Sequence, residues 1–214
     1  AIFPPFRLIS NSESLVLFIT PRLVTMVRYF LSEKSSDETR AVTREELIDL
    51  VEHARLTPSS VNKQALKYYL ACEREKTNQI QPLTAWAKAL KKEVPYEGHC
   101  PRAFIVICQD TAISTALEAY QKDVGIVAQT MLLRAAELGL GGCMIGSFQK
   151  NALHEVLKLS ENLVPLLVVA IGKPDETIVL EDVNVQGDTT YYRDAQDVHH
   201  VPKRTTRELI INGE

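Results

Sequence analysis

The segment Pro58-Ser59-Ser60-Val61-Asn62-Lys63-Gln64 gathers polar side chains where few are needed. A turn between a helix and a strand requires only one or two polar residues. Two hydroxyls, two carboxamides and an amine can instead bind a ligand that has many polar edges. The alternative is an ordinary capped turn, because serine and asparagine are common turn residues.

A glycine-rich segment, residues 139–148, is the second candidate. It is not a dinucleotide fingerprint, because Met144 stands where the third glycine belongs and the segment follows a helical pattern. At Gly146-Ser147, however, the backbone could approach a flat ligand with little side-chain obstruction. The alternative is a helix cap that leads into a strand and a turn.

The third candidate is the pair of cations Lys203-Arg204, which follows Pro202. An arginine guanidinium can bond two phosphate oxygens at once. The alternative is a solvated surface pair. The neighbouring His199 and His200 point to opposite faces of an extended segment and do not easily share a metal ion. We expect no protein-bound metal.

Helical and strand patterns alternate around these segments, without a repeat or a dividing linker. The helix expected at residues 117–138, directly before the glycine-rich segment, contains Asp123. This residue is either a packing group or a site residue. We expect one α+β domain over residues 31–214, preceded by an extension of uncertain role at residues 1–30, and a polar, extended tail after Lys173. The expected helices are 43–55, 83–92, 117–138 and 153–157, and the expected strands are 68–72, 103–108 and 164–171.

Composition excludes several classes of function. The 214 residues carry a net charge of −3, so nothing indicates a nucleic-acid partner. The apolar run at residues 14–19 is far shorter than the ~20 residues of a membrane span. Four scattered cysteines without CxxC spacing fit a reducing compartment better than a disulfide framework. We therefore expect a cytoplasmic protein.

The sequence Ala54-Arg55-Leu56-Thr57-Pro58-Ser59-Ser60-Val61-Asn62-Lys63-Gln64 resembles a motif of the nitroreductase family of FMN-dependent oxidoreductases, A-R-x-x-P-S-x-x-N-x-Q. The resemblance implies an α+β fold with a central, mostly antiparallel sheet flanked by helices, and a long central helix in a dimer. It also implies that the loop grips the ribityl chain and ring edge of FMN across the dimer interface, through Pro58, Ser59, Ser60, Asn62 and Gln64.

The other two candidates match the same family. Ile145, Gly146 and Ser147 match the backbone segment that lies against the flavin and donates to its N5 edge. Lys203 and Arg204 match the basic pair that clamps the FMN phosphate. Relatives also carry R-x-S-x-(R/K)-x-F-D near the start. Here Ser32, Lys34 and Asp37 fit that motif. Phe30 and Ser36 replace its arginine and phenylalanine, which would weaken FMN binding.

The implied activity is hydride transfer from NADH or NADPH to the flavin, and then to a small-molecule acceptor such as a nitroaromatic or a quinone. The implied assembly is an obligate homodimer with FMN at the subunit interface. Three alternatives stay open: a non-enzymatic flavin-binding or sensory protein, a flavin-dependent relative of the dehalogenases, and a protein that has lost its flavin. The sequence does not choose between NADH and NADPH.

Overall fold

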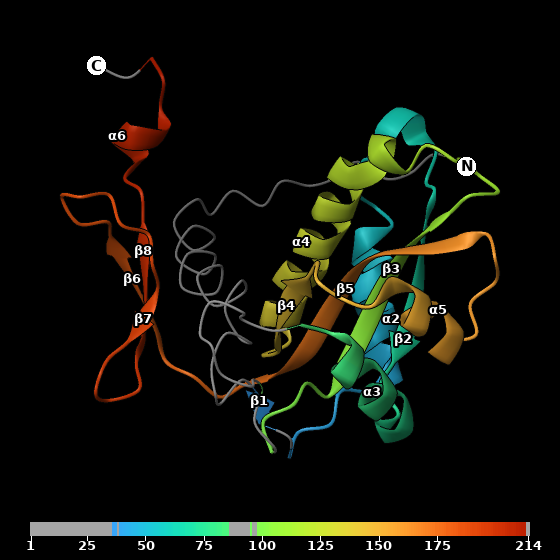
Figure 1. The fold of residues 1–214 in the computed structure, drawn as a ribbon, viewed down its shortest axis with the longest axis horizontal. Helices are drawn as coiled ribbons and strands as arrows, with labels where there is room; N and C mark the ends of the chain where they lie inside the picture. The colour runs from blue at the N-terminus through green and yellow to red at the C-terminus, as the bar shows by residue number, and fades with distance from the viewer. Residues whose placement is uncertain (1–35, 38, 86–94, 96–97, 213–214) are drawn as a thin grey trace, which may run out of the picture.

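Five antiparallel strands form the central sheet of this protein, which a computed structural model describes over residues 36–37, 39–85, 95 and 98–212 (Figure 1). The strand order is β1-β5-β3-β2, and β4 also pairs with β5. The strands are β1 (Ser36–Asp37), β2 (Leu66–Ala71), β3 (Ala103–Asp110), β4 (Gly141–Ile145) and β5 (Leu163–Pro174). The expected α+β class with a mostly antiparallel sheet is confirmed.

Helices cover both faces of this sheet, which explains why β3 is apolar from Ala103 to Cys108. Ile105 and Ile107 face one core with α2 (Arg44–Ala54) and α4 (Gln121–Glu137). Phe104 and Val106 point to the opposite face, because side chains alternate along a strand. There they pack in a second core, which α3 (Arg74–Ile80) and α5 (Lys150–Val156) help to build.

Local signals set the ends of the two helices that flank the polar loop. Thr43 caps α2, accepting a hydrogen bond from the Glu46 N–H, while the Glu46 side chain accepts one from the Thr43 N–H. This reciprocal pair satisfies two helix-end donors.

The expected helix 117–138 is instead a 3₁₀ turn, η4 (Leu117–Tyr120), followed by α4. Gly139 ends it with a φ of 72°, as expected of a C-terminal cap.

The helix expected at residues 83–92 is only partly described. Leu83, expected to begin helix 83–92, instead ends a 3₁₀ turn, η2 (Gln81–Leu83), and Thr84 bridges to Phe148. Residues 86–94 of that expected helix, and the extension at residues 1–30, lie outside the described residues. None of the helices in the described part of the chain is both long and apolar enough to cross a membrane.

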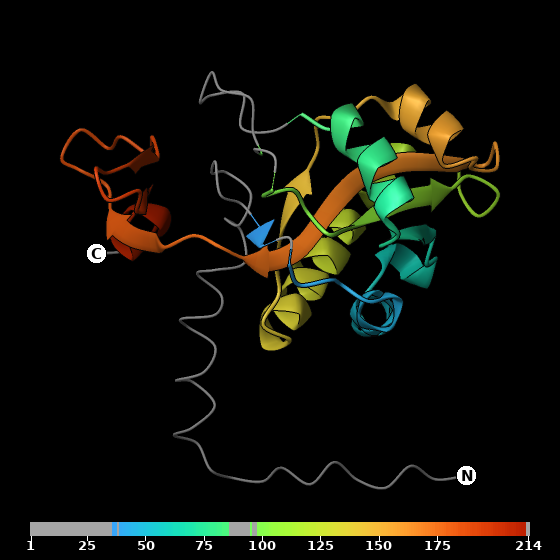
Figure 2. The ribbon, with the colours of Figure 1, turned by 90° about the horizontal axis from the view of Figure 1, so that it is seen from below.

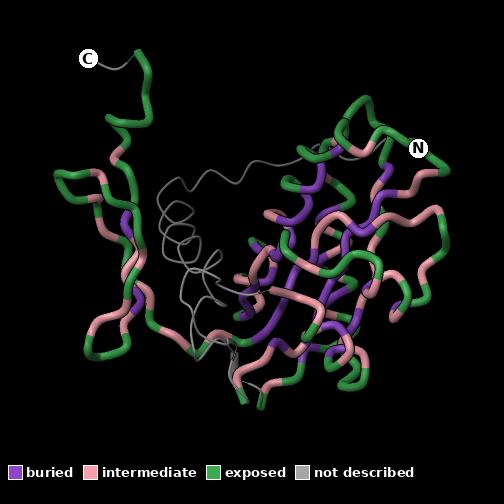
Figure 3. Tube along the Cα trace, in the orientation of Figure 1, coloured by how far each residue is buried: buried purple, intermediate pink, exposed green. Residues whose placement is uncertain are grey.

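The tail after Lys173 is not simply extended. It forms a second sheet, in which β8 pairs with β6 in parallel and with β7 antiparallel. We call residues 178–209 the C-terminal arm. Figures 1 and 2 both show the arm apart from the central sheet, and Figure 3 shows that little of it is buried. It contains β6 (Ile178–Asp182), β7 (Tyr192–Arg193), β8 (His199–Lys203) and α6 (Thr206–Leu209).

Candidate functional site

The polar loop, residues 58–64, has a strained backbone. Val61, Asn62 and Gln64 all have positive φ, between 46° and 52°. Such conformations cost ~1–3 kcal/mol each for residues other than glycine and persist only where the surroundings enforce them. For the β-branched Val61 this conformation is a genuine outlier. A turn that only joined α2 to β2 would not need this strain, which favours the ligand-binding interpretation over the capped turn.

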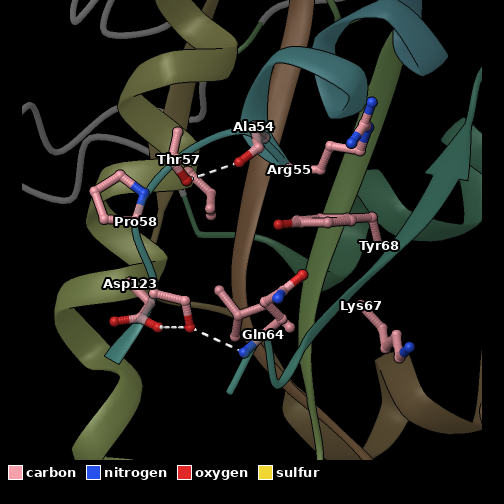
Figure 4. Close-up of a pocket in the computed structure, with 11 residues that line it drawn as sticks. Ala54, Arg55, Thr57, Pro58, Gln64, Lys67, Tyr68 and Asp123 are labelled. Carbon is pink, nitrogen blue, oxygen red and sulfur yellow. Dashed lines mark hydrogen bonds between the residues drawn. The ribbon is translucent and has the colours of Figure 1, made fainter. Parts of the chain in front are cut away.

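A buried carboxylate on α4 holds the loop. Asp123 is 4% exposed, and its Oδ2 accepts hydrogen bonds from the Ser59 hydroxyl at 2.7 Å and the Ser60 N–H at 2.9 Å. The Ser59 oxygen in turn accepts from the Gln64 N–H at 3.0 Å. Figure 4 shows this chain of bonds as dashed lines between Asp123 and Gln64. The structure thus assigns Asp123, undecided from the sequence, to the loop.

The two carboxamides of the loop face solvent together. The Gln64 Nε2 donates to the Asn62 Oδ1 at 3.1 Å, and both residues are exposed. This contact uses one donor and one acceptor, whereas each carboxamide offers two donors and an acceptor oxygen with two lone pairs. The remaining donors and acceptors of the two carboxamides therefore face solvent, where a ligand that binds over the loop can contact them.

Beneath the loop lies a pocket of about 180 Å³ between α2, β2 and α4 (Figure 4). Tyr68 lines it, and burial, together with the nearby Asp123 carboxylate, raises the pKa of Tyr68 to about 12. Its phenol is therefore protonated at neutral pH. Pockets for drug-sized ligands usually have ~300–1,000 Å³. This pocket alone is too small to hold a ligand as large as a flavin nucleotide.

The second candidate segment is an open strand end. Ile145 is buried and pairs with Val168, whereas Gly146 and Ser147 are exposed just beyond β4. The Ser147 carbonyl accepts the Ala85 N–H at 2.8 Å, which fixes the turn. A Cβ added at Gly146 would have no atom within 4 Å. The backbone there is accessible to a flat ligand from its open side.

The third segment lies on the arm. Pro202 is buried within the arm, while Lys203 and Arg204 at the end of β8 are exposed. Arg204 is 3.6 Å from the Glu208 carboxylate, an exposed contact. Such contacts contribute ~0–1 kcal/mol, so a phosphate could displace Glu208.

A single chain does not bring the three segments together. The loop contacts α4 on one face of the sheet, and Ile145 packs in the core of the opposite face. Lys203 and Arg204 belong to the arm, which stands apart in both views (Figures 1 and 2). Ser32 and Lys34, the remaining candidates, lie outside the described residues.

His200 connects the strands of the arm through two carboxylates. Its Nδ1 is 3.2 Å from Glu181 Oε2 and its Nε2 is 3.1 Å from Asp194 Oδ2. The Tyr192 ring stacks on it, with 4.8 Å between the ring centroids. Hydrogen bonds to Asp194 and then Glu181 raise the pKa of His200. The same bond from His200 holds the pKa of Asp194 below its usual value.

We expect the arm to loosen at alkaline pH. The pKa of His200 is higher in the folded state than in the unfolded state, where it is about 6.5. The stabilisation from His200 is therefore complete below the unfolded pKa and is lost as the pH rises through the folded pKa. Limited proteolysis of the arm at pH 6 and pH 9 measures this effect. The proteolysis rate of the wild type is divided by the proteolysis rate of His200→Gln at the same pH. A ratio that is the same at pH 6 and pH 9 would contradict the expectation.

Comparison with known proteins identifies the framework of this site. The model of the nitroreductase family matches residues 32–173, about two thirds of the chain. The chain belongs to the nitroreductase family. The match includes the loop, Asp123 and the segment at residues 145–147, and it ends before the arm. The family predicted from the three sequence segments is thus confirmed.

Curated nitroreductase relatives are distant but align over about two thirds of this chain. A putative NADH dehydrogenase/NAD(P)H nitroreductase of Archaeoglobus fulgidus is 25% identical over 64% of this chain and 77% of its own length. The oxygen-insensitive NADPH nitroreductase of Salmonella typhimurium is 27% identical over 69% of this chain and 61% of its own. The FMN reductase (NADPH) of Bacillus subtilis is 28% identical over 62% of this chain and 58% of its own.

Solved nitroreductase structures share the fold. A putative NADH dehydrogenase/NAD(P)H nitroreductase from Parabacteroides distasonis aligns with a TM-score of 0.59 at 22% identity, over 78% of this chain and 94% of its own. An FMN-dependent nitroreductase from Clostridium difficile aligns with a TM-score of 0.57 at 22% identity, over 78% of this chain and 92% of its own. The architecture of this chain is therefore that of the nitroreductases.

Proposed function

We propose that this nitroreductase-family chain is an FMN-dependent oxidoreductase that takes hydride from NADH or NADPH and delivers it to a small-molecule acceptor, such as a nitroaromatic or a quinone. The observation that carries the proposal is the polar loop, whose strained backbone presents Asn62 and Gln64 to solvent. Relatives named as an NADPH nitroreductase and an FMN reductase support the same chemistry.

The candidate residues suit different parts of an FMN molecule. Lys203 and Arg204 would hold the phosphate, and Ser60, Asn62 and Gln64 would bond the ribityl chain and the ring edge. The open side of Gly146 leaves room for a flat ring system, and the backbone from Ile145 to Ser147 would lie against it. When bound, FMN supplies the redox chemistry, while the protein binds and orients it.

The site would be completed by a second copy of the chain. One chain separates the three segments, and its pocket below the loop is too small for FMN. On α4, Ile126 is 39% and Leu133 is 36% exposed, although the helix buries Val124, Val127 and Met131 on its other side. A two-fold symmetric homodimer would cover the exposed apolar residues and form two equivalent sites.

We place the protein in the cytoplasm, where thiols stay reduced. Burial raises the pKa of Cys108 to about 12, and burial with the nearby Glu176 does the same for Cys143. Both thiols are therefore protonated and behave as small apolar groups rather than as nucleophiles.

The purified protein tests the proposal directly. It should be yellow, release FMN rather than FAD on denaturation, and lose its flavin absorption when NADH or NADPH is added without oxygen. It should also consume NADH or NADPH with a quinone as acceptor. A colourless protein that takes up no added FMN would overturn the proposal. A flavin-loaded protein that consumes neither nucleotide would be a non-enzymatic flavin-binding protein instead.

A further inference from the structure

Asp123 is a buried carboxylate whose described hydrogen bonds both go to the polar loop. It lies in the first turn of α4, where the positive end of the helix dipole favours an anion. A buried charge is costly unless it is hydrogen-bonded. Here the Ser59 hydroxyl and the Ser60 N–H supply the bonds, both to Oδ2. The carboxylate and the loop therefore stabilise each other.

One carboxylate controls both ends of the loop through Ser59. Oδ2 of Asp123 accepts the bond from Ser59, so the Ser59 hydroxyl directs its proton toward Asp123. The lone pairs of the same oxygen are then available to the Gln64 N–H, which lies 3.0 Å away. Without Asp123, the hydroxyl could rotate and the bond to Gln64 would no longer be enforced.

The strained residues lie between these two anchored ends. Val61 and Asn62 have positive φ inside the span, and Gln64 has positive φ at its end. Val61, Asn62 and Gln64 are all exposed, so packing within the described chain does not hold them in place. Backbone bonds from the Asn62 N–H to the Ser59 carbonyl at 2.9 Å and from the Lys63 N–H to the Ser60 carbonyl at 3.0 Å form the turn itself. The bonds to Asp123 fix the first residues of this turn to α4.

We propose that Asp123 is the positioning residue of the FMN site, which holds the polar loop through Ser59 and Ser60 in the conformation that presents Asn62 and Gln64 to the cofactor. This inference rests on the proposed function. Asp123 is buried under the loop, and its effect on FMN is transmitted through the loop residues. Its loss changes the shape of the site before any cofactor binds.

The test compares Asp123→Ala, Asp123→Asn and Glu118→Ala by two measurements. The first is FMN affinity, from the fluorescence of free FMN. The second is amide exchange of residues 59–64 in protein stripped of cofactor. Glu118 is an exposed carboxylate one turn before α4, so its removal is the matched control. Asparagine keeps an oxygen that can accept both bonds, and neither bond uses Oδ1, where its NH₂ would lie.

Asp123→Ala should weaken FMN binding at least ~10-fold, because it removes two bonds to a charged acceptor. It should also speed exchange of the Gln64 amide at least ~10-fold. Asp123→Asn should stay within ~3-fold of the wild type in both measurements, and Glu118→Ala should change neither. Unchanged exchange and affinity in Asp123→Ala would overturn the proposal. An Asn variant as impaired as the Ala variant would overturn it too, since an acceptor at that position would not suffice.

Ser59→Ala provides a test that does not depend on the folding of Asp123→Ala. It removes the relay to Gln64 but keeps the bond from the Ser60 N–H to Asp123. It should speed exchange of the Gln64 amide, which loses its acceptor on the Ser59 oxygen. An unchanged exchange rate at Gln64 in Ser59→Ala would contradict the relay. If the wild type binds no FMN, the proposed function fails, while exchange in the free protein still decides whether Asp123 holds the loop.

Discussion

Replacing both Lys203 and Arg204 by alanine is expected to lower FMN affinity more than ~100-fold. Each side chain would lose a hydrogen bond to a charged phosphate oxygen, worth ~1.5–3 kcal/mol. Two such losses correspond to at least two decades in the dissociation constant. Because both residues are exposed on the arm, the stability of the cofactor-free protein should change by less than ~0.5 kcal/mol.

The matched control for this pair is Arg207→Ala. Arg207 is another exposed cation of the arm, in α6, and is not part of the basic pair. Its removal tests whether any positive charge near the C-terminus suffices. FMN titration of both variants, with urea unfolding of the cofactor-free proteins, measures the outcome. If the double variant bound FMN as tightly as the wild type, Lys203 and Arg204 would be an ordinary solvated surface pair.

Replacing Gly142 by alanine is expected to destabilise the fold by about 3 kcal/mol, the upper end of ordinary overpacking effects. A Cβ at this position would lie 2.3 Å from the Ala170 carbonyl oxygen and 2.7 Å from the Leu132 Cδ2. The oxygen belongs to the backbone of β5, next to β4, and cannot move away without disturbing the pairing of the strands. Gly142 is therefore required where α4 approaches the sheet.

Gly125→Ala is the control for this substitution. Gly125 lies within α4, and a Cβ there would have no atom within 4 Å. Alanine should raise the free energy of unfolding by up to ~1 kcal/mol, because glycine is a poor helix former. Urea unfolding of both variants gives the comparison. A Gly142→Ala protein as stable as the wild type would show that the strands and α4 adjust readily.

Local sequence signals predicted the elements that carry their own boundaries. The helix expected at 43–55 is present as α2, because its capping residues Thr43 and Glu46 act within a few positions. The strand at 103–108 is present in β3, because an apolar run is required wherever both faces of a sheet are covered. The family motif predicted the correct fold for the same reason: its residues are contiguous.

Contacts between distant residues were not predictable in the same way. Asp123 is 64 positions from Ser59, and nothing in its own helix indicates that pairing. Gly142 was weighed as part of a ligand-binding segment, whereas the structure shows a packing reason for it. The arm was expected to be an extended tail, because its strands are short. Contacts such as that of His200 with Asp194 hold these strands together. A residue's own neighbours in sequence do not reveal such contacts.

The proposal that two chains share each FMN site has one direct test, which mixes two inactive variants. One carries Asn62→Ala and Gln64→Ala, and the other carries Lys203→Ala and Arg204→Ala. In refolded mixtures, heterodimers would combine one intact loop with one intact basic pair in half of their sites. With random pairing, about one quarter of all sites should recover NADPH-dependent reduction of a quinone. Heterodimers that form but stay inactive, or a stable monomer that binds FMN in sedimentation experiments, would contradict the shared site.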